Sequence, residues 1–424
     1  MTLTLQNKQF NPSLYANYLL IAYAFFLPIS HHIASTIMTF IVFFLLLSGN
    51  LKERFSAVIH DKIVIAFILV YSMYLVWMIG SDHIHIALLK LKEFMYLLYI
   101  IPIAMVLKKE FVQKILTSFV SAMLFSELVS YSMHFKITIP FLHLSSKTVN
   151  VPFMEWYTQY STILSITLGI ILYQLLTNKH LNFYLRILYI GFFISASLNI
   201  FIVASRIGYM LYALSIFVIL LITYKKQFLK IILYGLLIMT SGYITAYLSS
   251  DLFRARTMEA ANDIQKIFQG DLTTSLGVRA GFYTYSYDVI KHHLIFGVGT
   301  GDNIAEVGQQ ICLKEPNPKN IEGMMCNIRS GHNASLHSEY LDTLVQFGII
   351  GLLLFLNLFY QIYRYPQSND FLKMLQFLTV SVMLFVSIGS IIFIHADIGK
   401  VFVLLISLTL TIKPLNFTSA PRST

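Results

Sequence analysis

Three short stretches of the sequence hold side chains that could do chemistry together. Ala204-Ser205-Arg206 places an arginine between two apolar runs, Ser275-Leu-Gly-Val-Arg279 places a second in a polar segment, and His337-Ser338 precedes another apolar run. The arginine fork pairs with phosphate oxygens and keeps its charge, whereas a histidine with an ordinary pKa of about 6.5 is neutral yet basic at pH 7. The set could therefore bind an anion and accept a proton.

Each of these residues also has an ordinary explanation. Arg206 could be an arginine that snorkels from a helix end, because a charge near a membrane boundary must reach water or an anion. Arg279 could lie on the surface of an amphipathic helix, and His337 could cap a helix at the interface. Taken singly, these alternatives are at least as good as a catalytic role, so the order and spacing of the three stretches must decide.

The elements that position these residues are predicted to be membrane helices. The chain has 424 residues, of which 57% are hydrophobic and 12% charged, and its mean hydropathy is +0.70. A soluble domain has about 25% charged residues, so a water-soluble fold is excluded. Lipid forces each spanning segment to satisfy its own backbone hydrogen bonds as a helix. The predicted fold class is all-α integral membrane.

About twelve transmembrane helices are expected from the apolar runs. The basic residues of the short connections all fall on one side, which predicts that both termini are cytoplasmic and that the +10 net charge reports topology rather than a nucleic-acid partner. The first run is expected to be a retained span. The expected spans lie near 15–30, 33–49, 63–80, 90–107, 114–133, 157–177, 187–205, 207–223, 231–249, 338–362, 372–394 and 398–413.

The chain is expected to divide into three parts. Residues 1–249 hold the first nine helices, 250–337 form one large loop domain on the outer side, and 338–424 hold the last three helices and a cytoplasmic tail. Within the loop, a helix over 252–268 should end at Gly270, and Ser275 could cap a second helix that runs to about His293. Gly297-Val-Gly299-Thr-Gly301 is typical of a turn rather than a dinucleotide site, because no strand precedes it.

Together, the three stretches resemble the bacterial O-antigen ligase family and its wider superfamily of O-antigen polymerases and protein O-oligosaccharyltransferases. That pattern has an arginine at an outer span junction, a Ser-x-x-x-Arg segment in a large periplasmic loop, and a closing His-[Asn/Ser/Gln]-x9-Gly-x-x-[Gly/Thr/Tyr] motif. Here Arg206, Ser275 with Arg279, and His337-Ser338 with Gly348 and Gly351 match in order. His293 stands where relatives often have proline, which concerns only local loop geometry.

The resemblance implies a glycosyltransferase of lipopolysaccharide biosynthesis in the bacterial inner membrane, with its active site facing the periplasm. Its donor would be a glycan on undecaprenyl diphosphate, its acceptor lipid A–core, and its surroundings membrane lipids. Arg206 and Arg279 would hold the diphosphate, and His337 would be the general base of a direct, inverting displacement. Such a reaction needs no metal and no cofactor, and the sequence has neither a His-Glu-x-x-His nor an Asp-rich motif.

Several further residues are weaker candidates. Lys90, Lys92 and His332 could add contacts to the donor, although pairing within the protein explains the lysines equally well. His395, Asp397 and Lys400 could form an acceptor entrance in the turn between the last two spans, for which a solvated turn is the better alternative. Glu127 lies inside a span, where an ionisable group is functional by default.

The only two cysteines, Cys312 and Cys326, both fall in the large loop. An oxidising periplasm favours a disulfide between them over two free thiols, and closing a loop of about 15 residues stabilises by roughly 3 kcal/mol.

Other functions stay open at this point. An O-antigen polymerase or a protein O-oligosaccharyltransferase would share the same donor chemistry. A lipid or solute transporter would also have many spans, but transporters usually place polar groups near the membrane midplane in two related halves. Here the polar residues gather at one face and in one loop.

Overall fold

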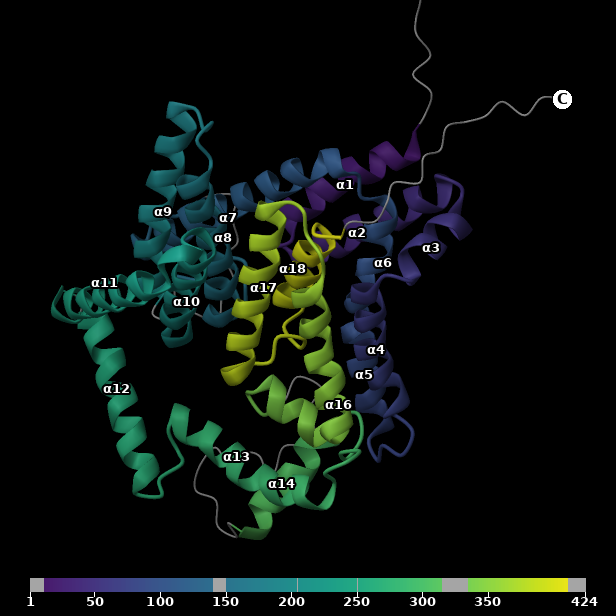
Figure 1. The fold of residues 1–424 in the computed structure, drawn as a ribbon. Coiled ribbons are helices and arrows are strands. Elements are labelled where there is room, and N and C mark those ends of the chain that lie inside the picture. Colours follow the sequence, from purple (N-terminus) through teal and green to yellow (C-terminus); the bar gives the residue numbers. More distant parts are fainter. Residues whose placement is uncertain (1–10, 140–149, 204, 250, 315–334, 411–424) are drawn as a thin grey trace, which may run out of the picture.

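The computed structural model describes residues 11–139, 150–203, 205–249, 251–314 and 335–410. Every regular element in these ranges is a helix (Figure 1). The predicted all-helical class is therefore confirmed for the described part of the chain.

Three of the first four helices begin at side chains that satisfy free backbone N–H groups. Asn11, Ser30 and Asp61 cap the first, second and fourth helices through their side-chain oxygens, as short polar residues at a helix start commonly do. The bounds are α1 Pro12–Phe26, α2 His31–Leu47, α3 Leu51–Ile59 and α4 Lys62–Val76.

The expected continuous span over 90–107 is broken in the structure. It consists of α5 Ile84–Glu93, the 3₁₀-helix η1 Phe94–Tyr99 and α6 Ile100–Val106. Pro102 lacks the N–H that would bond to the carbonyl of Leu98, but it lies in the first turn of α6, where a proline is tolerated. Tyr96 holds the 3₁₀ turn in place because its hydroxyl donates to the Phe393 carbonyl at 2.7 Å.

Longer apolar helices form the rest of the bundle. Within the described residues, six are long and apolar enough to cross a membrane, and α2 with α3, bent by 118°, would make a seventh. Twelve crossings and the sidedness of the termini stay predictions. The remaining bounds are η2 Lys109–Phe111, α7 Val112–His134, α8 Tyr157–Thr177, α9 Phe183–Val203, α10 Arg206–Thr223, η3 Lys225–Gln227, α11 Phe228–Ser249, α16 Glu339–Arg364, α17 Asp370–Gly389 and α18 Ala396–Ser407.

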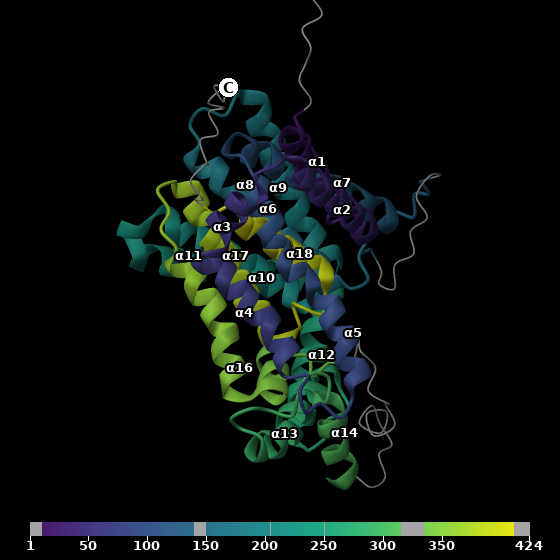
Figure 2. The same cartoon turned by 90° about the vertical axis from the view of Figure 1, so that its right-hand side faces the viewer.

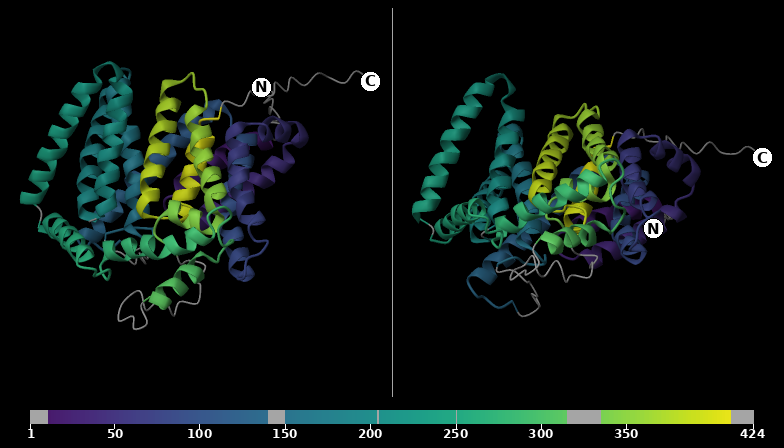
Figure 3. Two further views of the ribbon diagram at one scale, coloured as in Figure 1. Left: turned by 60° about the horizontal axis from the view of Figure 1, so that its bottom comes forward. Right: turned by 90° about the horizontal axis from the view of Figure 1, so that it is seen from below.

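Helix α8 lies at the centre of the bundle, and small residues bring its neighbours close. A Cβ atom on Gly208 of α10 would lie 2.7 Å from Ser161 Cβ, and one on Gly169 would lie 2.6 Å from a methyl group of Leu378 in α17. Such contacts are typical of membrane helices, where close packing replaces the hydrophobic effect. Helix α11 lies at the flank of the bundle, and its leucines are exposed (Figure 3).

The large loop forms three helices at one end of the bundle (Figures 1 and 2). They are α12 Asp251–Phe268, α13 Ser275–His292 and α14 Asn303–Lys314. Gly270 adopts φ +81° just after α12, as expected for a helix stop. The expected cap is shifted by one residue, because Thr274, not Ser275, accepts the N–H of Gly277, at 3.1 Å. A small separate core joins α13, α14 and the start of α16 through Phe282, Tyr285, Val289, Ile304, Val307, Ile311, Leu336, Leu341 and Val345.

Helix α16 is broken at Gly348, and the glycine-rich turn fits into the break. Gly348 adopts φ 64° and ψ −162° within the helix. The N–H of Val298 donates to the Val345 carbonyl at 3.0 Å, so the turn pairs with the open end of the first helical segment. A Cβ atom on Gly348 would lie 2.3 Å from the Ile295 carbonyl oxygen, and one on Gly297 would also clash with backbone. The predicted turn is confirmed, and these positions require glycine.

Candidate active site

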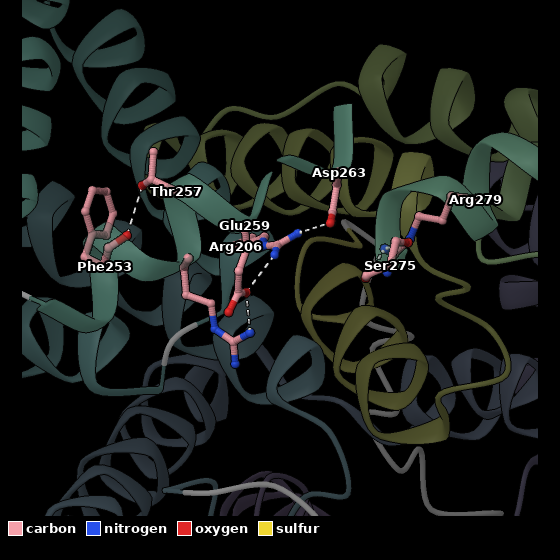
Figure 4. A network of polar contacts seen from close by, with 8 residues as sticks. Arg206, Phe253, Thr257, Glu259, Asp263, Ser275 and Arg279 are labelled. Carbon is pink, nitrogen blue, oxygen red and sulfur yellow. Dashed lines mark hydrogen bonds and ion pairs between the residues drawn. The ribbon is translucent and has the colours of Figure 1, made fainter. Parts of the chain in front are cut away.

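Arg206 is the first residue of α10 and reaches across to α12. Ser205, the residue before Arg206, caps α10 by accepting the N–H of Gly208. The guanidinium donates to Asp263 at 3.0 Å and to Glu259 at 2.9 Å (Figure 4). Glu259 and Asp263 are four residues apart and so share one face of α12. Arg256 also binds Glu259, at 2.9 Å. The predicted anion-binding arginine thus pairs with two carboxylates from the large loop.

Arg279 lies one helical turn into α13. Its Nη1 donates to the carbonyl of Ser275 at 2.9 Å and to the Ser275 hydroxyl at 3.1 Å, which explains the Ser-x-x-x-Arg spacing as a contact across one turn. Its Nε is buried and has no hydrogen-bond partner in the described part of the chain. Arg279 therefore keeps donor capacity for a ligand.

The two arginines are close enough to influence each other. Burial is the main cause that lowers the pKa of Arg279, and the positive charge of Arg206 lowers it further, whereas Asp263 opposes the shift. Figure 4 shows Ser275 and Arg279 on α13 beside the Arg206 cluster. The structure therefore brings the two predicted diphosphate ligands to one place.

His337 is held in an unusual backbone conformation between α13 and α16. Its φ of 55° lies in the left-handed region, which costs roughly 1 kcal/mol or more for a residue other than glycine. Two consecutive residues of α13 support it: the Phe282 ring stacks on the imidazole at 5.9 Å, and the Tyr283 hydroxyl donates to Ser338 at 2.9 Å. Ser338 in turn caps α16 by accepting the N–H of Leu341.

His337 is neutral at physiological pH. Its pKa is lowered to about 4, first because the surrounding chain displaces water and then because of the positive charges of Arg279 and His395. The residue still has an exposed surface, so a substrate can reach the ring. The structure thus places a neutral imidazole beside Arg279, which is itself beside Arg206.

Lys90 does not join this group. It is buried, and its ammonium donates to Asn303 at 3.0 Å and to Gln346 at 3.2 Å. Asn303 donates in turn to Asp342 at 2.6 Å. Pairing within the protein is therefore the better explanation of Lys90, which fastens α5 to α14 and α16. Lys92 is exposed on α5.

The turn between α17 and α18 is packed rather than solvated. Lys400 is 6% exposed and donates to Ser35 at 2.8 Å. Asp397 lies 3.9 Å from His31 on α2. His395 lies 3.2 Å from Gln159 on α8. This finding overturns the expectation of a solvated turn, because side chains of α2 and α8 cover it.

Two predicted features lie partly or wholly outside the described residues. His332 and Cys326 fall in 315–334, whereas Cys312 lies in α14. The 312–326 disulfide and a role for His332 stay predictions. The described ranges contain no group of three or more His, Cys, Asp or Glu residues placed to hold a metal ion, and metal independence also stays a prediction.

Sequence reasoning missed the partners of the predicted residues. The i, i+4 spacing of Glu259 and Asp263 could have suggested an acidic face on α12, but nothing in the sequence indicates that it meets Arg206. Phe282 and Tyr283 contact the His337-Ser338 pair. Apart from the helical periodicity of their segment, nothing in the sequence indicates these contacts.

Residues 190–356 match the family model described as O-Antigen ligase. No curated protein matches the chain. The matched segment begins in α9, ends in α16 and contains Arg206, Arg279 and His337. The match supports the conclusion that the protein is a multi-pass membrane enzyme of the O-antigen ligase or polymerase type, which acts on a lipid-linked glycan. The match over residues 190–356 thus confirms the family resemblance predicted from the motifs.

Proposed function

We propose that this protein is an O-antigen ligase that moves glycan from undecaprenyl diphosphate to lipid A–core at the periplasmic face of the bacterial inner membrane. The observation that carries the proposal is the grouping of two arginines and a neutral histidine inside the matched segment. Arg279 acts on the pKa of His337, and Arg206 acts on that of Arg279. The three side chains come from α10, α13 and the residue pair before α16.

The proposed reaction is a direct displacement at the anomeric carbon. A hydroxyl oxygen of the acceptor sugar attacks this carbon while His337 accepts the hydroxyl proton. The bond from the anomeric carbon to the phosphate oxygen breaks, and undecaprenyl diphosphate leaves with the electron pair. Arg206 and Arg279 stabilise the charge of the leaving group through bidentate hydrogen bonds. Attack opposite the leaving group inverts the anomeric centre.

Arg279 also controls the base. In the free protein, burial and then the positive charge of Arg279 hold the pKa of His337 low, so the imidazole is neutral but weakly basic. A bound diphosphate brings negative charge to the same place, which favours the protonated imidazole and raises its pKa. Donor binding would therefore strengthen the base at the moment when it is needed.

Transfer to defined acceptors tests this proposal. The purified protein receives a labelled glycan on undecaprenyl diphosphate with lipid A–core, with no second acceptor, or with a pilin-like protein. Glycan on lipid A–core supports a ligase, chain extension on the lipid carrier supports a polymerase, and glycan on protein supports a protein O-oligosaccharyltransferase. The His337→Ala protein is the matched inactive control.

A transporter is the alternative from another class. It would move the lipid-linked glycan across a vesicle membrane and leave the bond to diphosphate intact. Recovery of intact donor on the far side, with no transfer product in any arm, would support transport.

A further inference from the structure

His395 lies next to the proposed base because its loop is fastened to the start of α16. The carboxylate of Glu339, two residues after His337, accepts the N–H groups of Ile392 at 2.8 Å and Phe393 at 3.2 Å. His395 follows two residues later, and its protonated form would lower the pKa of His337. The two histidines thus belong to one neighbourhood, although they are far apart in the sequence.

The hydrogen bonds of Gln159 define the tautomer of His395. Gln159 is 4% exposed, and its side-chain oxygen accepts the N–H groups of Glu155 and Trp156, both at 3.1 Å. The amide nitrogen must therefore be the atom that faces His395 Nδ1, at 3.2 Å, and it donates to Nδ1. An Nδ1 that accepts a hydrogen bond carries no proton, so the proton of neutral His395 is on Nε2.

A neutral imidazole with this tautomer has a defined chemical role. Burial lowers the pKa of His395, while the carboxylate of Glu155 opposes the shift. The ring is therefore neutral at physiological pH and presents Nε2–H as a donor, while its only acceptor atom is occupied by Gln159. It cannot take a proton from a substrate, but it can donate a hydrogen bond to one.

The position of His395 indicates which substrate it serves. Arg279 and Arg206 supply the anion-binding side of the site, and His337 must touch the acceptor hydroxyl that it deprotonates. His395 is a neutral donor whose loop is fastened to Glu339, two residues after that base. On the basis of the proposed function, we infer that His395 binds the acceptor, its Nε2–H donating a hydrogen bond to a sugar oxygen beside the hydroxyl that His337 activates.

Three substitutions of His395 separate this role from a structural one. The amide nitrogen of glutamine can occupy the place of Nε2–H, whereas the shorter asparagine reaches only the place of Nδ1. His395→Ala should raise the KM for lipid A–core roughly three- to tenfold, the loss expected for one hydrogen bond, and leave the donor KM unchanged. His395→Gln should restore the acceptor KM to near that of the parent, and His395→Asn should not.

The results that overturn the inference are equally specific. An unchanged acceptor KM in His395→Ala removes the residue from acceptor binding. Equal behaviour of the Gln and Asn variants removes the Nε2–H donor, and a parallel loss of donor and acceptor binding indicates a structural role.

Gln159 provides a second, independent test. Gln159→Glu keeps an oxygen for the N–H groups of Glu155 and Trp156 but cannot donate to His395, so the favoured neutral tautomer reverses. The acceptor KM should rise in this variant and rise less when His395 is already glutamine. Gln113→Glu, an exposed amide at the start of α7, is the matched control and should behave as the parent. If Gln159→Glu raises the acceptor KM by the same factor in the parent and in the His395→Gln protein, Gln159 does not act through His395.

Failure of the proposed function can be told apart from failure of this inference. The former shows in the parent protein, which would then transfer glycan to another acceptor or bind no lipid A–core. The variants are then compared on the acceptor that the parent uses, and direct binding of that acceptor to the purified proteins, which needs no turnover, gives the same comparison. His395→Ala binding that acceptor as tightly as the parent would overturn the role of His395 in every case.

Discussion

Removing a carboxylate from α12 should strengthen donor binding. Arg206 must exchange its bonds to Glu259 and Asp263 for bonds to diphosphate, so these ion pairs oppose the donor. The Arg206 side chain is 27% exposed and that of Glu259 is 49% exposed. Exposed ion pairs contribute about 0.2–1 kcal/mol, which corresponds to a roughly 1.4- to 5-fold lower donor Kd in Glu259→Gln. Asp263, whose side chain is 13% exposed, should have the larger effect when changed to asparagine.

The competition should persist at neutral pH. The hydrogen bond from Arg256 is the largest cause that lowers the pKa of Glu259, and Arg206 adds to it. A carboxylate with a lowered pKa stays charged as the pH falls. It loses its ion pair only when the pH is below the ordinary pKa range of a carboxylic acid. The difference between parent and variant should therefore be constant from pH 8 to about pH 5.5, and salt should reduce it.

The assay is equilibrium binding of labelled undecaprenyl diphosphate glycan to purified protein at low ionic strength. Asp288→Asn is the control, because this loop carboxylate pairs with Lys314 and not with Arg206. Its donor Kd should equal that of the parent. Weaker donor binding in Glu259→Gln and Asp263→Asn would show that the carboxylates orient Arg206 for the donor instead of competing with it, and the reasoning would be refuted.

Four other outcomes are expected. His337→Ala should abolish transfer while the protein is present in the membrane at normal levels. In the parent protein, kcat/KM should fall with decreasing pH only near pH 4, where the imidazole of the free protein gains a proton. A midpoint near the ordinary histidine pKa of about 6.5 would contradict this. Arg206→Lys and Arg279→Lys should each lose roughly tenfold or more of the transfer rate, because the charge stays but the fork is lost; parent-like turnover by both would exclude bidentate binding. Chelators should leave transfer unchanged, and a loss in EDTA that a divalent ion restores would argue against the scheme. Thiol labelling of the unreduced, denatured protein should find Cys312 and Cys326 protected, and two alkylated cysteines would disprove the disulfide.

The sequence predicted the loop helices well because their ends depend on local chemistry. Gly270 stops α12, and the Thr274-Ser275 pair starts α13, so the expected bounds of 252–268 and 275–293 differ from the observed ones by one residue. The span expected over 90–107 failed for a different reason. Hydropathy does not report backbone geometry, and residues 94–99 form a 3₁₀-helix whose Tyr96 contacts a distant loop.

The candidate site could be predicted by residue type but not by its partners. Arg206, Arg279 and His337 were identified because their order and spacing resemble the O-antigen ligase family and because their types suit diphosphate and proton transfer. Glu259 reaches Arg206 across 53 residues, and Gln159 reaches His395 across 236. These contacts depend on how helices assemble, and no local pattern in the chain encodes them.

The spacing of the closing motif has a physical reason in α16. Nine residues separate His337-Ser338 from the break at Gly348, and three polar side chains on one face of that stretch are buried against other elements. Glu339 binds the turn before α18, and Asp342 and Gln346 join the network around Lys90. Their i, i+3, i+7 spacing fits one helix face, so one added or deleted residue would turn His337 by about 100° relative to it. The part of α16 before Gly348 anchors the turn before α18 and also fixes the direction of His337, the proposed base.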